Sequence, residues 1–161
     1  MTEGTIFSIN TSPGGAPKLT ILDAMVTAMG LDSDSHTNLK HHGGPERAVC
    51  LFAIERILAL GEEGHPIGTG TTGENLTLAG IAWDLVVPGT MLETGDCLLE
   101  IVSYAAPCRT IRGSFIGEKF SRMSQAHFPG WSRVYARVIR GGMIRTGDRV
   151  VLTQGGYGSY R

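Results

Sequence analysis

The chain of 161 residues contains little lysine and no long apolar run. A membrane-spanning helix needs about 20 consecutive apolar residues, and the N-terminal stretch MTEGTIFSIN has neither the basic start nor the apolar core of a signal peptide. We therefore expect a cytoplasmic protein without a membrane partner. Three lysines accompany eleven arginines, and the formal net charge is -1, so the sequence predicts no basic face for nucleic acid. Arginine suits bidentate binding of phosphate or carboxylate, so this composition is compatible with a small anionic ligand.

Cysteine is scarce as well. Cys50, Cys97 and Cys108 are odd in number and far apart, and no C-x-x-C pair is present, so neither a disulfide framework nor a zinc ribbon fits. Cys50 lies in the apolar run RAVCLFAI and Cys97 opens the strand-like CLLEIV, so both are predicted to pack in the core. The chain also lacks a P-loop, a dinucleotide-binding glycine fingerprint and a Gly-x-Ser-x-Gly elbow. A nucleotide-triphosphate site is therefore not expected.

Glycine is abundant, with 23 residues spread between short apolar runs. This pattern is typical of many short strands joined by tight turns in one domain. Helical spacing of Ile54, Ile57, Leu58 and Gly61 predicts one helix. A weaker helix is predicted from Cys108 to Ile116, and residues 121–131 show no clear pattern. These features predict a mostly β fold, a β-barrel with a few short helices. The predicted strands cover residues 5–10, 20–27, 48–53, 75–78, 98–104, 134–139 and 149–153.

Two segments of the chain are alike, TMLETGDCLLE from Thr90 and GMIRTGDRVVL from Gly142. Each has the pattern of a strand, a Thr-Gly-Asp turn and a second strand, so we expect two similar hairpins that close opposite parts of the barrel. Asp96 and Asp148 are expected to bond to their own turns. A catalytic role for these aspartates is the alternative.

The stretch YAAPCRTI places Cys108 between a proline and an arginine. Pro107 ends strand pairing because it has no amide donor. Positive charge from Arg109 and Arg112, together with the amides of a following helix, would favour the thiolate form of Cys108. A thiolate is both a nucleophile and a soft metal ligand. The residues alone leave a reactive Cys108 and a structural one as open alternatives.

Two glycine-containing loops precede predicted strands. In KHHGGPERAV, His42 can donate a hydrogen bond or move a proton, or it can simply satisfy the backbone of a rigid turn. The neighbouring histidines lack the carboxylate or cysteine spacing of a zinc site. In GTGTTGENLT, backbone amides can face an anion, and Asn75 either reads the edge of a heterocycle or caps the turn.

Five stretches follow one another along the chain: GLDSDSH (30–36), HHGGPERAV (41–49), TTGENLTLAG (71–80), GDCLLEIVSYAAPC (95–108) and ARVIRGGMIRTGD (136–148). In this order they resemble the molybdenum cofactor sulfurase C-terminal (MOSC) domain family, in its stand-alone, short bacterial form. The combination of His-Gly-Gly-Pro, Gly-Glu-Asn and Pro-Cys is more specific than any one of them, although Ser33 replaces a glycine usual in the family. The resemblance predicts a single domain over residues 1–161, with matching residues from about 4 to 152 and a flexible tail at 154–161.

The resemblance implies a MOSC-type β-barrel that binds the molybdenum cofactor, a molybdopterin with a terminal phosphate. The family's cysteine falls on Cys108, which in reductase members is a molybdenum ligand and in others is proposed to carry sulfur as a persulfide. Lys18 resembles an early lysine of the family near the cofactor phosphate. The predicted cofactor-binding residues are Lys18, His42, Asn75, Arg109 and Arg112, with Cys108 as the catalytic residue and metal ligand.

The implied activity is reduction of an N-hydroxylated small molecule, or sulfur transfer through Cys108. A non-catalytic cofactor carrier or partner-binding module is the alternative. Larger family members carry an attached ferredoxin domain, which this length does not accommodate, so reductase activity would need a separate electron-donor protein. Fused members also carry a pyridoxal-phosphate domain. With 161 residues there is no room for it, and pyridoxal phosphate is not expected to bind.

Overall fold

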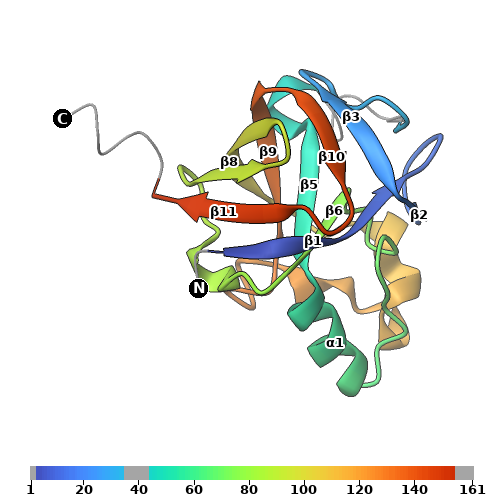
Figure 1. Cartoon of the computed structure of the whole chain (residues 1–161). Coiled ribbons are helices and arrows are strands. Elements are labelled where there is room, and N and C mark those ends of the chain that lie inside the picture. The colour runs from blue at the N-terminus through green and yellow to red at the C-terminus, as the bar shows by residue number, and fades with distance from the viewer. Residues whose placement is uncertain (1–2, 35–43, 155–161) are drawn as a thin grey trace.

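Seven strands close into a barrel (Figure 1). The computed structural model describes residues 3–34 and 44–154. Neighbouring strands follow the order β1, β11, β7, β8, β9, β5, β6 and back to β1. The β5–β6 pair is parallel, and the other six pairs of this ring are antiparallel. The mostly β barrel predicted from the sequence is confirmed. The strand bounds are β1 Glu3–Thr11, β5 Val49–Ala53, β6 Leu76–Ala79, β7 Met91–Thr94, β8 Cys97–Ala105, β9 Arg133–Arg140 and β11 Arg149–Thr153.

A three-stranded sheet stands beside the barrel and consists of β10 (Gly142–Arg145), β3 (Asp23–Thr27) and β4 (Gly30–Leu31). The prediction of one strand over residues 20–27 is wrong. The chain breaks at the exposed Leu22, so β2 (Leu19–Ile21) pairs with β1 of the barrel while β3 pairs with β10. One apolar run in the sequence thus forms two strands that belong to two different sheets.

The two Thr-Gly-Asp segments differ in structure. The first is the predicted hairpin, because β7 and β8 pair directly. The second is not a hairpin, since β10 pairs with β3 and β11 pairs with β7 and β1. Its turn is closed as predicted by Asp148, whose Oδ2 accepts the Arg145 amide at 2.8 Å. The two segments also touch: the Asp96 amide donates to the Met143 carbonyl at 3.1 Å, and a Cβ added to Gly142 would lie 2.5 Å from the Asp96 Cβ.

One α-helix, α1 (Ile54–Glu62), follows β5 without a loop. Ile54, Ile57 and Leu60 form its buried face, whereas Leu58, which was predicted to share that face, is exposed. The weaker helix predicted after Cys108 is a 3₁₀ helix, η3 (Arg109–Ser114). Within the described ranges, no helix is long and apolar enough to cross a membrane. The other 3₁₀ helices are η1 Pro45–Arg47, η2 Trp83–Leu85, η4 Ile116–Glu118 and η5 Phe120–Met123.

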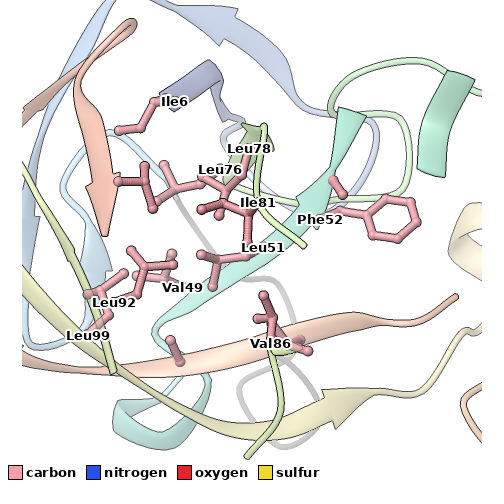
Figure 2. Packing of buried hydrophobic residues seen from close by; sticks show 14 of the residues in the cluster. Ile6, Val49, Leu51, Phe52, Leu76, Leu78, Ile81, Val86, Leu92 and Leu99 are labelled. Atoms are coloured by element: carbon pink, nitrogen blue, oxygen red, sulfur yellow. The ribbon is translucent and has the colours of Figure 1, made fainter. Parts of the chain in front are cut away.

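Aliphatic side chains from the barrel strands fill its interior (Figure 2). Successive residues of a strand face opposite sides of the sheet, and Val49 and Leu51 of β5 therefore point inward. The Phe52 ring lies on the other side of β5, where it packs edge-to-face on Trp83 with ring centroids 5.9 Å apart. Side chains on the outer face of β5 are thus also buried, and the Cys50 side chain belongs to this outer set.

Residues 121–131, which showed no clear sequence pattern, are held by stacking of arginine guanidinium groups on aromatic rings. The Arg122 guanidinium lies 4.3 Å from the Trp131 ring centroid and 4.6 Å from that of Phe128. Arg56 of α1 lies 4.6 Å from the Trp131 ring centroid and donates from Nε to the Gly130 carbonyl at 2.9 Å. Cation–π contacts of this kind stabilise by about 0.5–2 kcal/mol each. They fasten this segment to α1 immediately before β9 begins.

Candidate functional site

A β-bulge in β8 sets which residues of β8 lie opposite the outward-facing residues of β9. The ladder pairs Ile101 with Ala136 and then Ser103 with Tyr135, so one residue of β8 has no direct partner. Because a bulge shifts the alternation of side chains by one residue, Ala105 becomes the partner of Arg133. By the alternation of β9 itself, its outer face presents Arg133 and Tyr135 beside the end of β8, three residues before Cys108.

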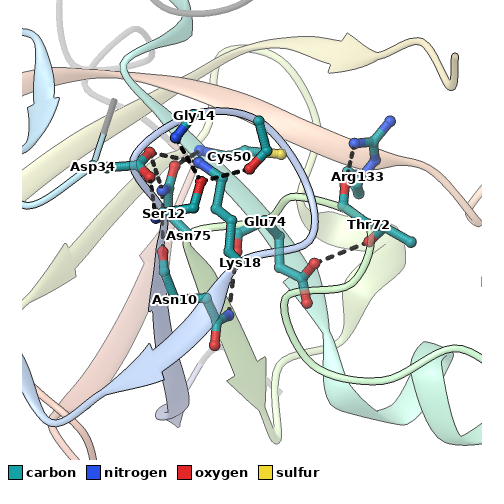
Figure 3. A network of polar contacts seen from close by, with 11 residues as sticks. Asn10, Ser12, Gly14, Lys18, Asp34, Cys50, Thr72, Glu74, Asn75 and Arg133 are labelled. Atoms are coloured by element: carbon teal, nitrogen blue, oxygen red, sulfur yellow. Dashed lines mark hydrogen bonds and ion pairs between the residues drawn. The ribbon is translucent and has the colours of Figure 1, made fainter. Parts of the chain in front are cut away.

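Lys18, Asp34 and Asn75 form a buried group that we call the Lys18 cluster (Figure 3). The Lys18 Nζ lies 2.5 Å from Oδ2 of Asp34, and the two side chains are 6% and 1% exposed. Oδ2 of Asp34 also accepts the Asn75 amide group at 2.8 Å, and Oδ1 accepts the Ser12 backbone amide at 2.9 Å. Three segments that lie far apart in the sequence therefore meet at one carboxylate.

Asn75 acts as a bridge within this cluster. Its Oδ1 accepts the Cys50 amide at 2.9 Å, while its Nδ2 donates to Asp34 and, at 3.3 Å, to the Asn10 carbonyl. The side chain is buried with its donors and its acceptor engaged. The structure thus shows Asn75 holding β5, β1 and Asp34 together, and its predicted role in cofactor binding stays a prediction.

Glu74 is a buried carboxyl group next to this cluster. Its Oε2 accepts the Gly70 amide and the Thr77 hydroxyl, each at 2.9 Å, and its Oε1 accepts the Thr72 hydroxyl at 2.9 Å. Burial raises the pKa of Glu74 above its ordinary value, and these hydrogen bonds oppose the rise only in part. The sequence analysis included Glu74 only as part of a motif. The sequence feature that could have predicted its burial is the position of an acidic residue immediately before an apolar strand.

Cys108 lies at the start of η3, with its side chain half-buried. Its Sγ is 2.8 Å from the Thr110 hydroxyl oxygen. The Ser114 hydroxyl at the other end of η3 donates to the Thr71 hydroxyl at 3.1 Å. This bond connects the Cys108 segment with the loop that leads to Asn75.

Cys50 and Cys97 are both buried, which confirms the sequence prediction for them. Burial raises the pKa of each thiol to about 11. The positive charges of Arg133 and Lys18 oppose the rise at Cys50. Neither thiol is therefore set up as a nucleophile at neutral pH, and Cys108 differs from both in its access to solvent.

Arg109 and Arg112 do not converge on the Lys18 cluster. Both are exposed; Arg112 donates from Nη1 to the Arg109 carbonyl at 2.8 Å, and its Nε lies 3.8 Å from a Glu118 carboxyl oxygen. Both positive charges are close to Cys108 in sequence, and that of Arg112 is partly balanced at the surface by Glu118. His42 lies outside the described residues, so its predicted role stays a prediction. Among residues 3–34 and 44–154, no three His, Cys, Asp or Glu side chains gather as a metal site.

Arg133 and Tyr135 were not predicted as site residues. Arg133 is 5% exposed and donates to the carbonyls of Thr72 at 2.5 Å and Ala106 at 3.4 Å. Burial raises the pKa of Tyr135 to about 12; the nearby thiols of Cys50 and Cys108 add to this rise, and Arg133 opposes it. An arginine at the first position of an apolar strand was the one sequence signal for this pair.

A comparison with known families decides the classification of this chain. The MOSC domain model matches residues 38–151, more than half of the chain. The chain belongs to the MOSC domain family. Within this MOSC domain, the matched region begins before β5 and ends in β11, and it includes both Asn75 and Cys108.

Individual relatives agree with this classification. The uncharacterized protein YflK of Bacillus subtilis is 27% identical over 135 residues, which cover 82% of this chain and 59% of YflK. The protein YiiM of Escherichia coli is 28% identical over 114 residues, covering 68% of this chain and 51% of YiiM. The crystal structure of YiiM from Geobacillus stearothermophilus superposes with a TM-score of 0.74 at 26% identity, over 97% of this chain and 78% of that one. The chain thus spans 59% and 51% of the two curated relatives it matches.

Proposed function

We propose that this MOSC domain binds the molybdenum cofactor and that the Cys108 thiolate is its protein ligand to molybdenum. The supporting observation is that Cys108 is the one cysteine of the three with access to solvent, and that η3, which begins just after it, is hydrogen-bonded through Ser114 to the loop before Asn75. Soft thiolates suit transition metals of this kind. The other two thiols are buried, and their raised pKa values make them poor ligands.

The residues around Cys108 fit an anionic cofactor. The buried guanidinium of Arg133 has an Nε without a hydrogen-bond partner, and the exposed Arg109 and Arg112 add positive charge at the rim. Lys18 can contribute to phosphate binding only by sharing its ammonium group with Asp34. When bound, the cofactor would supply two-electron oxygen-transfer chemistry, while the protein supplies orientation and charge.

The proposed reaction is reduction of an N-hydroxylated small molecule to the parent amine or amidine. It consumes two electrons and two protons and releases one water molecule. The electrons would come from a separate donor protein. Half-exposed Cys108 at the beginning of η3 would mark the place where the substrate approaches.

Sulfur transfer is a second candidate at the same site, because a solvent-accessible thiol beside positive charge can also carry a persulfide. A third candidate is a carrier that binds the cofactor and does not turn over. The three differ in outcome: the reductase consumes an N-hydroxylated compound with an artificial electron donor, the sulfur carrier releases sulfide from its persulfide when an added thiol supplies the two electrons, and the cofactor carrier does neither.

The experiment that tests cofactor binding is the measurement of molybdenum and pterin after purification from a host that makes the cofactor. Wild type, Cys108→Ala and Cys97→Ala are compared, with Cys97→Ala as the control for loss of a thiol elsewhere. We expect near-stoichiometric metal in wild type and Cys97→Ala and its loss in Cys108→Ala. Equal metal in all three variants, or none in wild type, contradicts the proposal.

A further inference from the structure

Arg133 brings a positive charge into the protein that no carboxylate of the described residues neutralises. Its side chain is buried, at 5% exposure, and its nearest acceptors are the backbone carbonyls of Thr72 and Ala106. Its Nε is buried without a hydrogen-bond partner. Because arginine stays protonated in proteins, this charge is permanent, and burying it is costly unless something anionic compensates.

The two carbonyls belong to two different loops of the candidate site. Thr72 lies in the loop that leads to Asn75, and Ala106 lies two residues before Cys108. A guanidinium presents its donors in a rigid fork, so one arginine can hold two acceptors at once, whereas a lysine ammonium is a compact point charge on a flexible stem. Arg133 therefore fixes the Cys108 segment relative to the Lys18 cluster.

Arg133 also differs from Lys18 in charge balance. The Lys18 ammonium is paired with Asp34 at 2.5 Å. The carboxyl group of Glu74 is connected to Arg133 only indirectly: the Thr72 hydroxyl donates to Glu74, while the Thr72 carbonyl accepts from Arg133. Arg133 therefore supplies the buried positive charge near Cys108. The positive charges of Arg109 and Arg112 lie at the surface.

We propose that Arg133 is a positioning residue for Cys108 and that its uncompensated charge makes the space at Cys108 selective for anionic ligands. This inference deepens the proposed function, because an anionic cofactor or substrate is what such a site would admit. Its test uses the protein without cofactor, so it succeeds or fails independently of whether molybdenum binds.

The charge is tested by alkylating Cys108 with two reagents of similar size, the neutral iodoacetamide and the anionic iodoacetate. The ratio of the two rate constants at one pH reports the local potential, because the fraction of thiolate is common to both reactions. We expect the iodoacetate-to-iodoacetamide ratio to fall about threefold or more in Arg133→Gln. It should stay near the wild-type value in Arg133→Lys, which keeps the charge. A merely structural role would change both rate constants and leave their ratio unaltered.

The positioning is tested by hydrogen exchange, read by mass spectrometry in peptides that cover residues 105–111. Both substitutions remove the forked contact to two loops. We therefore expect exchange there to accelerate about tenfold in Arg133→Lys and in Arg133→Gln, as the loss of one charged hydrogen bond implies. Peptides from β7 should be unaffected.

Arg137→Gln is the matched control, because Arg137 lies on the same strand and faces the same side but is exposed and paired with Glu100. Two results would overturn the inference: a rate ratio in Arg133→Gln equal to that of Arg137→Gln, or unchanged exchange over residues 105–111 in Arg133→Lys. If Arg133→Gln does not fold, hydrogen exchange in Arg133→Lys still tests the positioning role. The effect of the buried charge is then tested by comparing the iodoacetate-to-iodoacetamide rate ratio of the wild type at low and high salt. A buried charge is screened weakly, so a ratio that collapses in salt would assign the effect to the exposed arginines and contradict the inference.

Discussion

The Lys18 ammonium and the Asp34 carboxylate form an ion pair whose partners are both almost fully buried, with Nζ 2.5 Å from Oδ2. Lys18 precedes β2 and Asp34 follows β4, so this pair ties the chain between them to the barrel. In a buried pair, removal of one partner leaves the other as an unpaired charge in a poorly solvated place.

We predict that Asp34→Asn destabilises the protein by about 3–5 kcal/mol, the usual cost of leaving a buried cation unpaired. Lys18→Met should cost less, because the Asp34 carboxylate keeps its bonds from Ser12 and Asn75. The double variant should be more stable than Asp34→Asn alone. Urea unfolding of the four proteins measures this interaction energy, and simple additivity of the two single changes would speak against a coupled pair.

Thiol labelling should distinguish the three cysteines. We expect iodoacetamide at neutral pH to modify Cys108 in the native protein, while Cys50 and Cys97 stay protected because they are buried and burial raises the pKa of each to about 11. All three should react in urea. Peptide mass spectrometry reads the sites. Native modification of Cys50 or Cys97 at a rate comparable with that of Cys108 would show that the core opens more readily than this packing implies.

The raised pKa of Glu74 predicts that part of the free energy of unfolding depends on pH. Burial raises its folded pKa above the ordinary value, so the folded state holds this proton more tightly than the unfolded chain does. The stabilisation is complete below the unfolded pKa of about 4.3 and is lost as pH rises through the folded pKa. Compared with wild type, Glu74→Gln should therefore gain relative stability as pH rises from about 4.5 to 8. Chemical denaturation at several pH values tests this, and a stability difference independent of pH would contradict it.

The contact between the two Thr-Gly-Asp segments predicts different costs for two glycine substitutions. Gly142 and Gly147 both have positive φ, 148° and 93°. An added Cβ at Gly142 meets the Asp96 Cβ at 2.5 Å, whereas at Gly147 nothing lies within 4 Å. Gly147→Ala should cost only the backbone strain, about 1 kcal/mol, and Gly142→Ala should cost clearly more. Thermal unfolding gives the comparison; equal costs would mean that β10 can move away from the β7–β8 turn.

Local patterns in the sequence were sufficient for the barrel strands and for α1. Alternating or continuous apolar runs between glycine-containing turns predicted most of the ladder. They failed where pairing partners decide the outcome: residues 20–27 form one apolar run, yet Leu22 separates a barrel strand from a strand of the small sheet. Residues 142–153 repeat a true hairpin in sequence but pair elsewhere. Strand propensity and turn chemistry predict where strands form, but they do not specify which strand pairs with which.

The candidate site was predictable to a similar degree. The resemblance to the MOSC family led to Lys18, Asn75 and Cys108, and the structure brings Lys18 and Asn75 together through Asp34. Arg133 was missed because an arginine at a strand start is ordinarily exposed, and its burial depends on contacts with the Thr72 and Ala106 loops that the sequence of β9 does not specify.

The parallel pairing of β5 and β6 has a consequence for how this domain can vary. Because the two strands run in one direction, α1 and the loop after it must carry the chain back to the edge where β5 began. The beginnings of both strands are thereby held at one end of the barrel, while α1 projects at the other (Figure 1). Insertions or deletions at the far end of this crossover, around the exposed Glu62, can change its length without altering the spacing of the two strand starts. Length variation and site geometry are thus separable in this architecture.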